Sequence, residues 1–186
     1  PPWVAPEPYN ELYPPETLKD FVRQQDMATE GAQHPLLQAY LNKPRVGAPL
    51  DDNKTARLKA SYFGLMTEVD HNLGRLFEYL KESGQWDNTL IVFTSDHGEQ
   101  IGDHWLIGKM GYFDASYHIP LIIRDPDAIN TRGLQIEAFT ENVDIMPTML
   151  DWLDLDIPNQ CDGKSLISII RNGKIPDYWR DAAHWE

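Results

Sequence analysis

Cysteine is almost absent from this chain of 186 residues, and the single Cys161 excludes a fold stapled by disulfides within the chain. Cationic side chains are also in the minority. Only 16 Lys and Arg residues stand against 29 Asp and Glu residues, which gives a formal net charge of −13. Such a charge argues against nucleic acid or an anionic membrane as a partner. No apolar run approaches the roughly 20 residues that a membrane-spanning helix needs.

The pentapeptide Ser95–Glu99 (S-D-H-G-E) is the most informative feature that the chain contains. It directly follows Thr89–Thr94, a β-branched and aromatic run that predicts a buried strand. Open α/β sheets bind their ligands at the carboxyl ends of strands. Asp96 offers an oxygen ligand there and His97 a nitrogen ligand, so the pair is a candidate for half of a divalent-metal site.

Lys109 follows Asp96 by thirteen residues, in a glycine-bounded stretch that can fold back toward the metal pair. The run Tyr117–Arg124 then predicts a second buried strand. Asp-His-Gly by itself is a weak signal, because Asp and His are ordinary loop residues. A lysine exposed on a mobile loop is the competing interpretation of Lys109.

The whole stretch resembles the C-terminal signature of the sulfatases and phosphonate monoester hydrolases of the alkaline phosphatase superfamily. The matching motifs follow the family's order: D-x-x-x-G-R-L at Asp70–Leu76, S-D-H-G-E at Ser95–Glu99, G-D-H and G-K within Gly102–Lys109, P-L-I-I-R at Pro120–Arg124, V-D-I-x-P-T-M-L at Val143–Leu150 and D-G-K-S-L at Asp162–Leu166. Several motifs in one order are far more specific than any one of them. The run Lys109–Asp114 favours the phosphonate monoester hydrolase branch.

The resemblance implies an α/β fold: part of an alkaline-phosphatase-like sandwich with a central mixed sheet flanked by helices, plus the start of a small C-terminal subdomain. We expect three segments, which are a proline-rich extended and short-helix segment at 1–50, the C-terminal part of the catalytic α/β domain at 51–142, and the start of the subdomain at 143–186. Because the family's enzymes are much longer, we expect a fragment truncated at both ends. A cytoplasmic location is the expectation, although such a fragment could not display a signal peptide.

Local patterns predict the elements. A long helix over 53–82 carries one apolar stripe, from Leu58 to Leu80, that we expect to pack across the strands. The neighbours Asp70 and His71 point in different directions on that helix, which disfavours a second metal pair. The other expected elements are helices at 16–25, 35–41, 145–153 (capped by Asp144) and 166–171 (capped by Ser165), strands at 89–94, 120–124 and 138–140, and a strand-like end within 177–186.

The resemblance also implies the chemistry of the site. Asp96 and His97 would be two ligands of one divalent metal ion. Imidazole makes Mn²⁺ the first expectation, with Fe²⁺, Zn²⁺ and Ca²⁺ as alternatives. Lys109 would contact the non-bridging or leaving-group oxygens of a small anionic ester substrate. A formylglycine nucleophile would lie upstream, because Cys161 is outside the C-x-P-x-R motif from which that group is made. The complete enzyme is expected to be a homo-oligomer.

Three further residues near the pair each have two candidate roles. His104 stands in the G-D-H stretch, where lining the substrate pocket and a structural role are equally supported. His118 precedes the second strand, where we favour a buried position or support of a ligand. Glu99 could support the metal pair or mark the start of a helix.

Three functions remain open at this point. The first is the C-terminal part of a metal-dependent hydrolase of sulfate or phosphonate/phosphate esters, inactive alone because its nucleophile is missing. The second is a phosphotransferase of the same superfamily that uses threonine. The third is a non-catalytic binding or assembly module.

Overall fold

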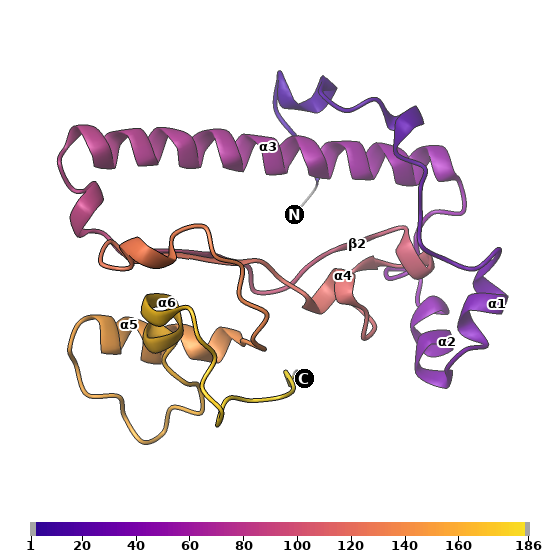
Figure 1. The fold of residues 1–186 in the computed structure, drawn as a ribbon. Coiled ribbons are helices and arrows are strands. Elements are labelled where there is room, and N and C mark those ends of the chain that lie inside the picture. Colours follow the sequence, from indigo (N-terminus) through magenta and orange to yellow (C-terminus); the bar gives the residue numbers. More distant parts are fainter. Residues whose placement is uncertain (1–2, 185–186) are drawn as a thin grey trace. The chain divides into compact units, whose positions relative to one another are not determined.

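Helix α3, Asp52–Glu82, is the longest element of the protein (Figure 1). It begins where the Asp51 carboxylate accepts the Asn53 N–H at 2.9 Å, as an N-cap residue does. It ends before Gly84, whose φ of +70° suits a glycine just past a helix. The predicted helix over 53–82 is therefore confirmed. The structure, a computed structural model, describes residues 3–184.

The proline-rich segment lies along one side of α3, with two short 3-10 turns, η1 (Tyr9–Glu11) and η2 (Pro15–Thr17) (Figure 1). The approach is close, because a Cβ on Gly64 would lie 2.4 Å from the Tyr9 carbonyl oxygen. The Ser61 hydroxyl donates to the Trp3 carbonyl oxygen at 2.9 Å. The deepest positions of α3 are small or short: Thr55, Ala56, Ala60 and Gly64.

The apolar stripe predicted on α3 is not the deeply buried face in this chain. Met66, Val69 and Leu76 are 55%, 52% and 49% exposed, respectively. Burial concentrates instead on small side chains, since these allow the backbone of the proline-rich segment to approach. The packing of α3 across the strands stays a prediction.

The helix predicted at 16–25 is wrong, because only the turn η2 forms there. The following residues are drawn into contacts with distant parts of the chain. The Val22 N–H donates to the Asp103 carboxylate at 2.8 Å. The Arg23 guanidinium lies 3.8 Å from the ring centre of Trp105. These tertiary contacts outweigh the local helix signal of Pro15 and Glu16.

Two compact packing units divide the chain, and each contains parts that are distant in sequence. The first holds Pro1–Gly84 with His97–Ile119, and the second holds Gln85–Asp96 with Pro120–Glu186. The predicted division into 1–50, 51–142 and 143–186 stays a prediction. Among residues 3–184, no helix has the length and apolar character to cross a bilayer.

The remainder of the first unit surrounds a small apolar core of Leu37, Leu41, Trp105 and Leu106. Helix α2 begins at Pro35 as predicted, and strands β2 and β3 pair antiparallel, Gln100 with Gly108 and Ile101 with Ile107. The elements of this part are α1 (Met27–Gly31), α2 (Pro35–Leu41), β2 (Gln100–Ile101), η4 (Asp103–Trp105), β3 (Ile107–Gly108) and α4 (Asp114–Tyr117).

The second unit is built on strands β1 (Ile91–Thr94) and β4 (Leu121–Arg124), which pair antiparallel from Ile91↔Arg124 to Thr94↔Leu121. Both strands were predicted, and the α/β class is confirmed. The strand predicted at 138–140 is wrong, because this stretch runs irregularly beside an apolar hollow. The helical elements of this unit are η3 (Trp86–Asn88), η5 (Ile129–Thr131), η6 (Asn142–Asp144), α5 (Ile145–Trp152) and α6 (Ile167–Asn172).

The predicted α5 and α6 are confirmed to within about two residues, which is the usual uncertainty of helix ends. The Ser165 hydroxyl accepts the Ile167 N–H at 3.2 Å, as expected of a residue that starts α6. The strand-like end is not formed up to residue 184, and residues 185–186 lie outside the described part.

Asp144 does not cap α5 through its side chain, contrary to expectation. Its fully buried carboxylate instead accepts the Glu141 N–H at 2.8 Å and the Lys164 N–H at 2.8 Å. The Arg180 guanidinium donates to both of its oxygens at 2.7 Å. One buried charge therefore ties three separate stretches of the second unit together, and each of its oxygens has partners.

Asp125 is a second buried carboxylate of this unit, with a side chain that is 0% exposed. It accepts hydrogen bonds from Arg171 Nε at 2.7 Å, Trp152 Nε1 at 3.1 Å and the Asp127 N–H at 3.1 Å. Burial alone raises the pKa of Asp125, but these donors and the charge of Arg171 outweigh it and hold the pKa below its ordinary value.

We expect acid to destabilise the protein through Asp125. Because its pKa is lower in the folded than in the unfolded state, its contribution is complete above the unfolded pKa of about 3.9 and is lost as the pH falls through the folded pKa. Asp125→Asn should lower the free energy of unfolding at neutral pH by roughly 1–3 kcal/mol and flatten its decline in acid. Urea unfolding between about pH 3 and pH 7 measures both effects. The exposed Asp156→Asn is the matched control, and equal pH profiles for the two variants would contradict the assignment.

Candidate metal and substrate site

The candidate metal ligands Asp96 and His97 lie in the connection that follows β1. Asp96 is exposed and ends a segment of the second unit, while His97 is half-buried and begins a segment of the first. The strand expected before the pair is present and ends at Thr94. The two candidate ligands are therefore consecutive in sequence just beyond a strand end, as the sequence predicted.

The ring orientation of His97 suits a metal ligand. Its Nδ1 lies 2.7 Å from the Gly98 carbonyl oxygen. A carbonyl oxygen only accepts, so Nδ1 carries the hydrogen and the neutral ring has its lone pair on Nε2. A backbone partner on the other nitrogen is the usual arrangement for a histidine that binds metal. A carboxylate oxygen and an imidazole nitrogen are donor types that Mn²⁺, Fe²⁺ and Zn²⁺ accept, so the chemistry of the two residues fits such an ion.

Further metal ligands can be sought only in the part of the chain that the structure describes. Among residues 3–184, no group of three or more His, Cys, Asp or Glu side chains could hold a metal ion. His71, the other histidine considered, has its Nδ1 2.6 Å from the Tyr9 hydroxyl. The assignment of Asp96 and His97 as metal ligands stays a prediction.

The β2–β3 hairpin determines where Lys109 lies. Gln100 pairs with Gly108, so the next positions outward, Glu99 and Lys109, come level with each other. His97 is two residues before Glu99, so the chain returns to the neighbourhood of the candidate ligand just where Lys109 stands. Lys109 is exposed, which leaves its ammonium accessible to a ligand. Its catalytic role stays a prediction.

The turn after His97 packs directly on the backbone near α4. The Gly98 N–H donates to the Ser116 carbonyl oxygen at 2.7 Å. A Cβ on Gly98 would lie 2.1 Å from the Ala115 carbonyl oxygen, a distance that real side chains do not adopt. Position 98 therefore requires glycine because of the close approach.

Glu99 lies beneath this loop and does not start a helix, since strand β2 follows it. Burial raises the pKa of its carboxyl, while the hydrogen bond from the Gly108 N–H opposes the rise. Its Oε1 is buried without a hydrogen-bond partner in the part of the chain that the structure describes. Burial and the charge of Glu99 also raise the pKa of Tyr62 on α3. Glu99 thus packs inward, against α3 and the hairpin.

His104 occupies the tip of the hairpin, at the end away from His97 and Lys109. Its backbone is left-handed, with φ of 52°. Its Nδ1 lies 3.0 Å from the buried Glu30 carboxylate, and its ring stacks on Phe113 with centroids 3.5 Å apart. These contacts anchor the loop to α1, which favours the structural alternative. A place in the substrate pocket stays a prediction.

The structure also bears on His118 and on three buried residues that the sequence did not indicate. His118 follows α4 and is exposed in this chain, so the predicted buried position is wrong because the residue caps a surface turn. Support of a ligand by His118 stays a prediction. Sequence reasoning missed Glu30, Gln100 and Ser116, which are buried partners of the loop, because nothing in their local sequence links them to it.

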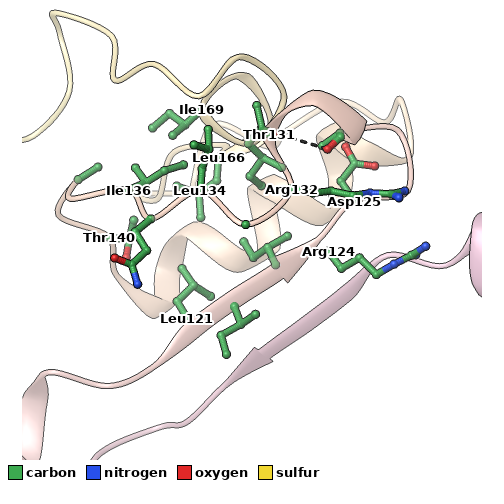
Figure 2. Close-up of a pocket in the computed structure, with 17 residues that line it drawn as sticks. Leu121, Arg124, Asp125, Thr131, Arg132, Leu134, Ile136, Thr140, Leu166 and Ile169 are labelled. Atoms are coloured by element: carbon green, nitrogen blue, oxygen red, sulfur yellow. Dashed lines mark hydrogen bonds between the residues drawn. The ribbon is translucent and has the colours of Figure 1, made fainter. Parts of the chain in front are cut away.

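The second unit contains an apolar hollow of about 540 Å³ between β4, α6 and the irregular stretch 131–140. Figure 2 shows Leu121, Leu134, Ile136, Leu166 and Ile169 around it. Neither metal-ligand candidate lines this hollow, and neither does Lys109. The sequence did not predict it, because its lining comes from stretches as far apart as residues 121 and 170.

Comparison with known proteins identifies the family of this chain. Residues 6–155 match the family model described as Sulfatase. The chain belongs to the sulfatase family. This sulfatase-family chain is 45% identical to the multifunctional alkaline phosphatase superfamily protein PehA of Trinickia caryophylli, over 100% of the chain and 38% of that protein.

Solved and curated relatives of the sulfatase-family chain include both branches that the motifs indicated. The crystal structure of a phosphonate monoester hydrolase of Agrobacterium radiobacter matches with a TM-score of 0.90 and 42% identity, covering 98% of this chain and 38% of that one. An N-acetylglucosamine-6-O-sulfatase of Bacteroides thetaiotaomicron is 39% identical over 75% of the chain and 25% of its own length. The chain thus spans less than two-fifths of these relatives.

We expect Gly98→Ala to destabilise this sulfatase-family chain by roughly 1–3 kcal/mol, because the new methyl group would force the 97–98 turn away from the Ala115 carbonyl. The same substitution at Gly74, in the middle of α3 with no atom within 4 Å, is the matched control. Gly74→Ala should stabilise by about 0.5–1 kcal/mol, since alanine is the better helix former. Urea unfolding of both variants gives the signs, and a neutral Gly98→Ala would refute the close packing of this turn.

Proposed function

We propose that this chain forms part of the active site of a metal-dependent hydrolase that cleaves sulfate, phosphonate or phosphate esters. The observation that carries the proposal is the β2–β3 register, which brings Lys109 level with Glu99, two residues from His97. A metal ligand and a cation then stand at the same end of one hairpin. Such a pair suits a reaction that develops negative charge on oxygen.

Asp96 and His97 are proposed to hold the metal ion, with Asp96 contributing an oxygen and His97 its Nε2. When bound, the ion would supply positive charge beside the oxygens of the substrate. The Gly98 carbonyl holds the His97 ring in the ligating tautomer. Mn²⁺ is the proposed ion, because a mixed oxygen and nitrogen donor set disfavours Ca²⁺.

Lys109 is proposed to stabilise charge that grows during the reaction. Its ammonium group would contact the non-bridging oxygens of the bound ester or the leaving oxygen. The interaction strengthens as the bond breaks, because the negative charge on these oxygens increases. The small anionic substrate is drawn in by this local charge, since the chain as a whole carries −13.

The nucleophile is proposed to come from a part of the enzyme outside these 186 residues. The sequence contains no C-x-P-x-R motif, and Cys161 lies in a loop before α6. A formylglycine elsewhere in the enzyme would split the reaction into two steps. This chain alone is therefore expected to turn over no ester.

Phosphonate monoesters are the preferred substrate class, on the sequence Lys109–Asp114 and the likeness to a phosphonate monoester hydrolase at 42% identity. Sulfate esters are the second candidate, supported by the sulfatase at 39% identity. The phosphotransferase and the non-catalytic module remain the alternative functions, and the turnover measurements below test the non-catalytic one. A homo-oligomeric complete enzyme and a cytoplasmic location remain predictions.

In the complete enzyme, Asp96→Ala should remove metal and activity together, because one carboxylate serves both. Elemental analysis of the purified variant measures the metal content, and turnover of a phosphonate monoester and an aryl sulfate measures the activity. Asp156→Ala, at an exposed position, is the control for loss of an aspartate. Unchanged metal content in Asp96→Ala would contradict the ligand assignment.

Lys109→Ala should lower kcat by roughly 10²- to 10³-fold, as loss of one preorganised electrostatic donor does. Metal content should stay the same, because Lys109 is not a ligand. Lys54→Ala, an exposed lysine on α3, is the matched control and should change turnover less than about threefold. Steady-state kinetics decides the matter, and near-wild-type turnover of Lys109→Ala would end the catalytic assignment.

A further inference from the structure

Gln100 is a fully buried polar residue at the start of β2. Its Nε2 donates to the Met110 carbonyl oxygen at 2.8 Å and to the Ser116 hydroxyl at 3.2 Å. The carbonyl oxygen can only accept, so it fixes which end of the side-chain amide faces the loop. Gln100 therefore binds the backbone of Met110, the residue that directly follows Lys109.

The other end of the Gln100 amide is unusual. Its Oε1 is buried and has no hydrogen-bond partner among residues 3–184. A buried acceptor without a donor lowers stability, and an apolar residue at this position would avoid that loss. The Oε1 end of the glutamine therefore contributes nothing to stability, and its role lies in the two hydrogen bonds that Nε2 makes.

Ser116 joins the same contacts to the turn after His97. It is fully buried, and its carbonyl oxygen accepts the Gly98 N–H at 2.7 Å. Its own N–H donates to the Phe113 carbonyl oxygen at 2.9 Å. Through one buried residue, the His97 turn is thus connected to Gln100 and, through Gln100, to Met110.

We propose that Gln100 and Ser116 are positioning residues that hold Lys109 in a fixed place relative to His97. The inference rests on the proposed function and adds how that site is kept in order. The β2–β3 ladder ends at Gly108, and one residue beyond Lys109 the bond from Gln100 to Met110 holds the chain to β2. Without that bond the ammonium would occupy many positions, and few of them would contact the reacting oxygens.

The test uses Gln100→Met in the complete enzyme, because methionine matches glutamine in shape and lacks its donors. The variant should lose about 10- to 100-fold in kcat, with metal content unchanged and KM altered less than kcat. Ser116→Ala removes only the hydroxyl and should lose less. Gln160→Met, at an exposed position, is the matched control and should behave as wild type.

A double-mutant cycle identifies the residue through which Gln100 acts. If Gln100 acts by placing Lys109, adding Gln100→Met to Lys109→Ala should lower kcat less than about twofold further. Full additivity of the two losses would overturn the proposal, since it means that Gln100 acts elsewhere. A large loss in Lys109→Ala with none in Gln100→Met would overturn the positioning role and leave the proposed function standing.

Hydrogen exchange supplies a readout that does not depend on turnover. In Gln100→Met the Gly98 and Ser116 amides should exchange at least about tenfold faster than in wild type, while amides in the middle of α3 stay unchanged. Unchanged exchange at both amides would overturn the proposal that Gln100 and Ser116 hold this part of the loop, whatever the kinetic result. Faster exchange with Lys109→Ala fully active would refute both the role of Lys109 and its positioning by Gln100.

Discussion

The antiparallel pairing of β2 with β3 is the constraint on which the first unit and the candidate site depend. The ladder is only two residue pairs long, so it needs support from outside. The Ile107 N–H donates to the Val46 carbonyl at 2.8 Å, and the Ala48 N–H donates to the Trp105 carbonyl at 2.7 Å. A third stretch of chain thus flanks the hairpin, while buried Leu106 fixes it to the apolar core. The end of the hairpin that carries Glu99 and Lys109 is therefore attached to a well-supported pair of strands.

Three buried carboxylates connect separate stretches of the chain through hydrogen bonds, beside an apolar core that is small. Glu30 accepts hydrogen bonds from the Gln24 N–H and the Gln33 side chain and pairs with His104, while Asp125 and Asp144 gather donors in the second unit. Each of the three joins stretches that are distant in sequence. Such buried charges are tolerated because each is matched by several donors. Removing one of these donors leaves the carboxylate with an incompletely compensated charge. The architecture is therefore specific, and sensitive to single polar substitutions.

The sequence predicted those elements whose signal is local. α3 has an N-cap and a glycine stop, and β1 and β4 are short runs rich in Ile and other strand-forming apolar residues, so each could be predicted from its own residues. The helix at 16–25 failed because Val22 and Arg23 bind residues about eighty positions away. The candidate ligands Asp96 and His97, and Lys109, are predicted from motifs alone. Gln100 and Ser116 could not be found, since their significance lies in hydrogen bonds that form only after the hairpin folds.

The exposed apolar side chains along α3 have a practical consequence for anyone who prepares this chain alone. Met66, Val69 and Leu76 lie about half exposed on one long helix. Apolar side chains that line up on a helix surface attract other apolar surfaces, including those of identical molecules. Preparations should therefore be handled dilute and checked by light scattering, because concentration alone would favour colloidal association.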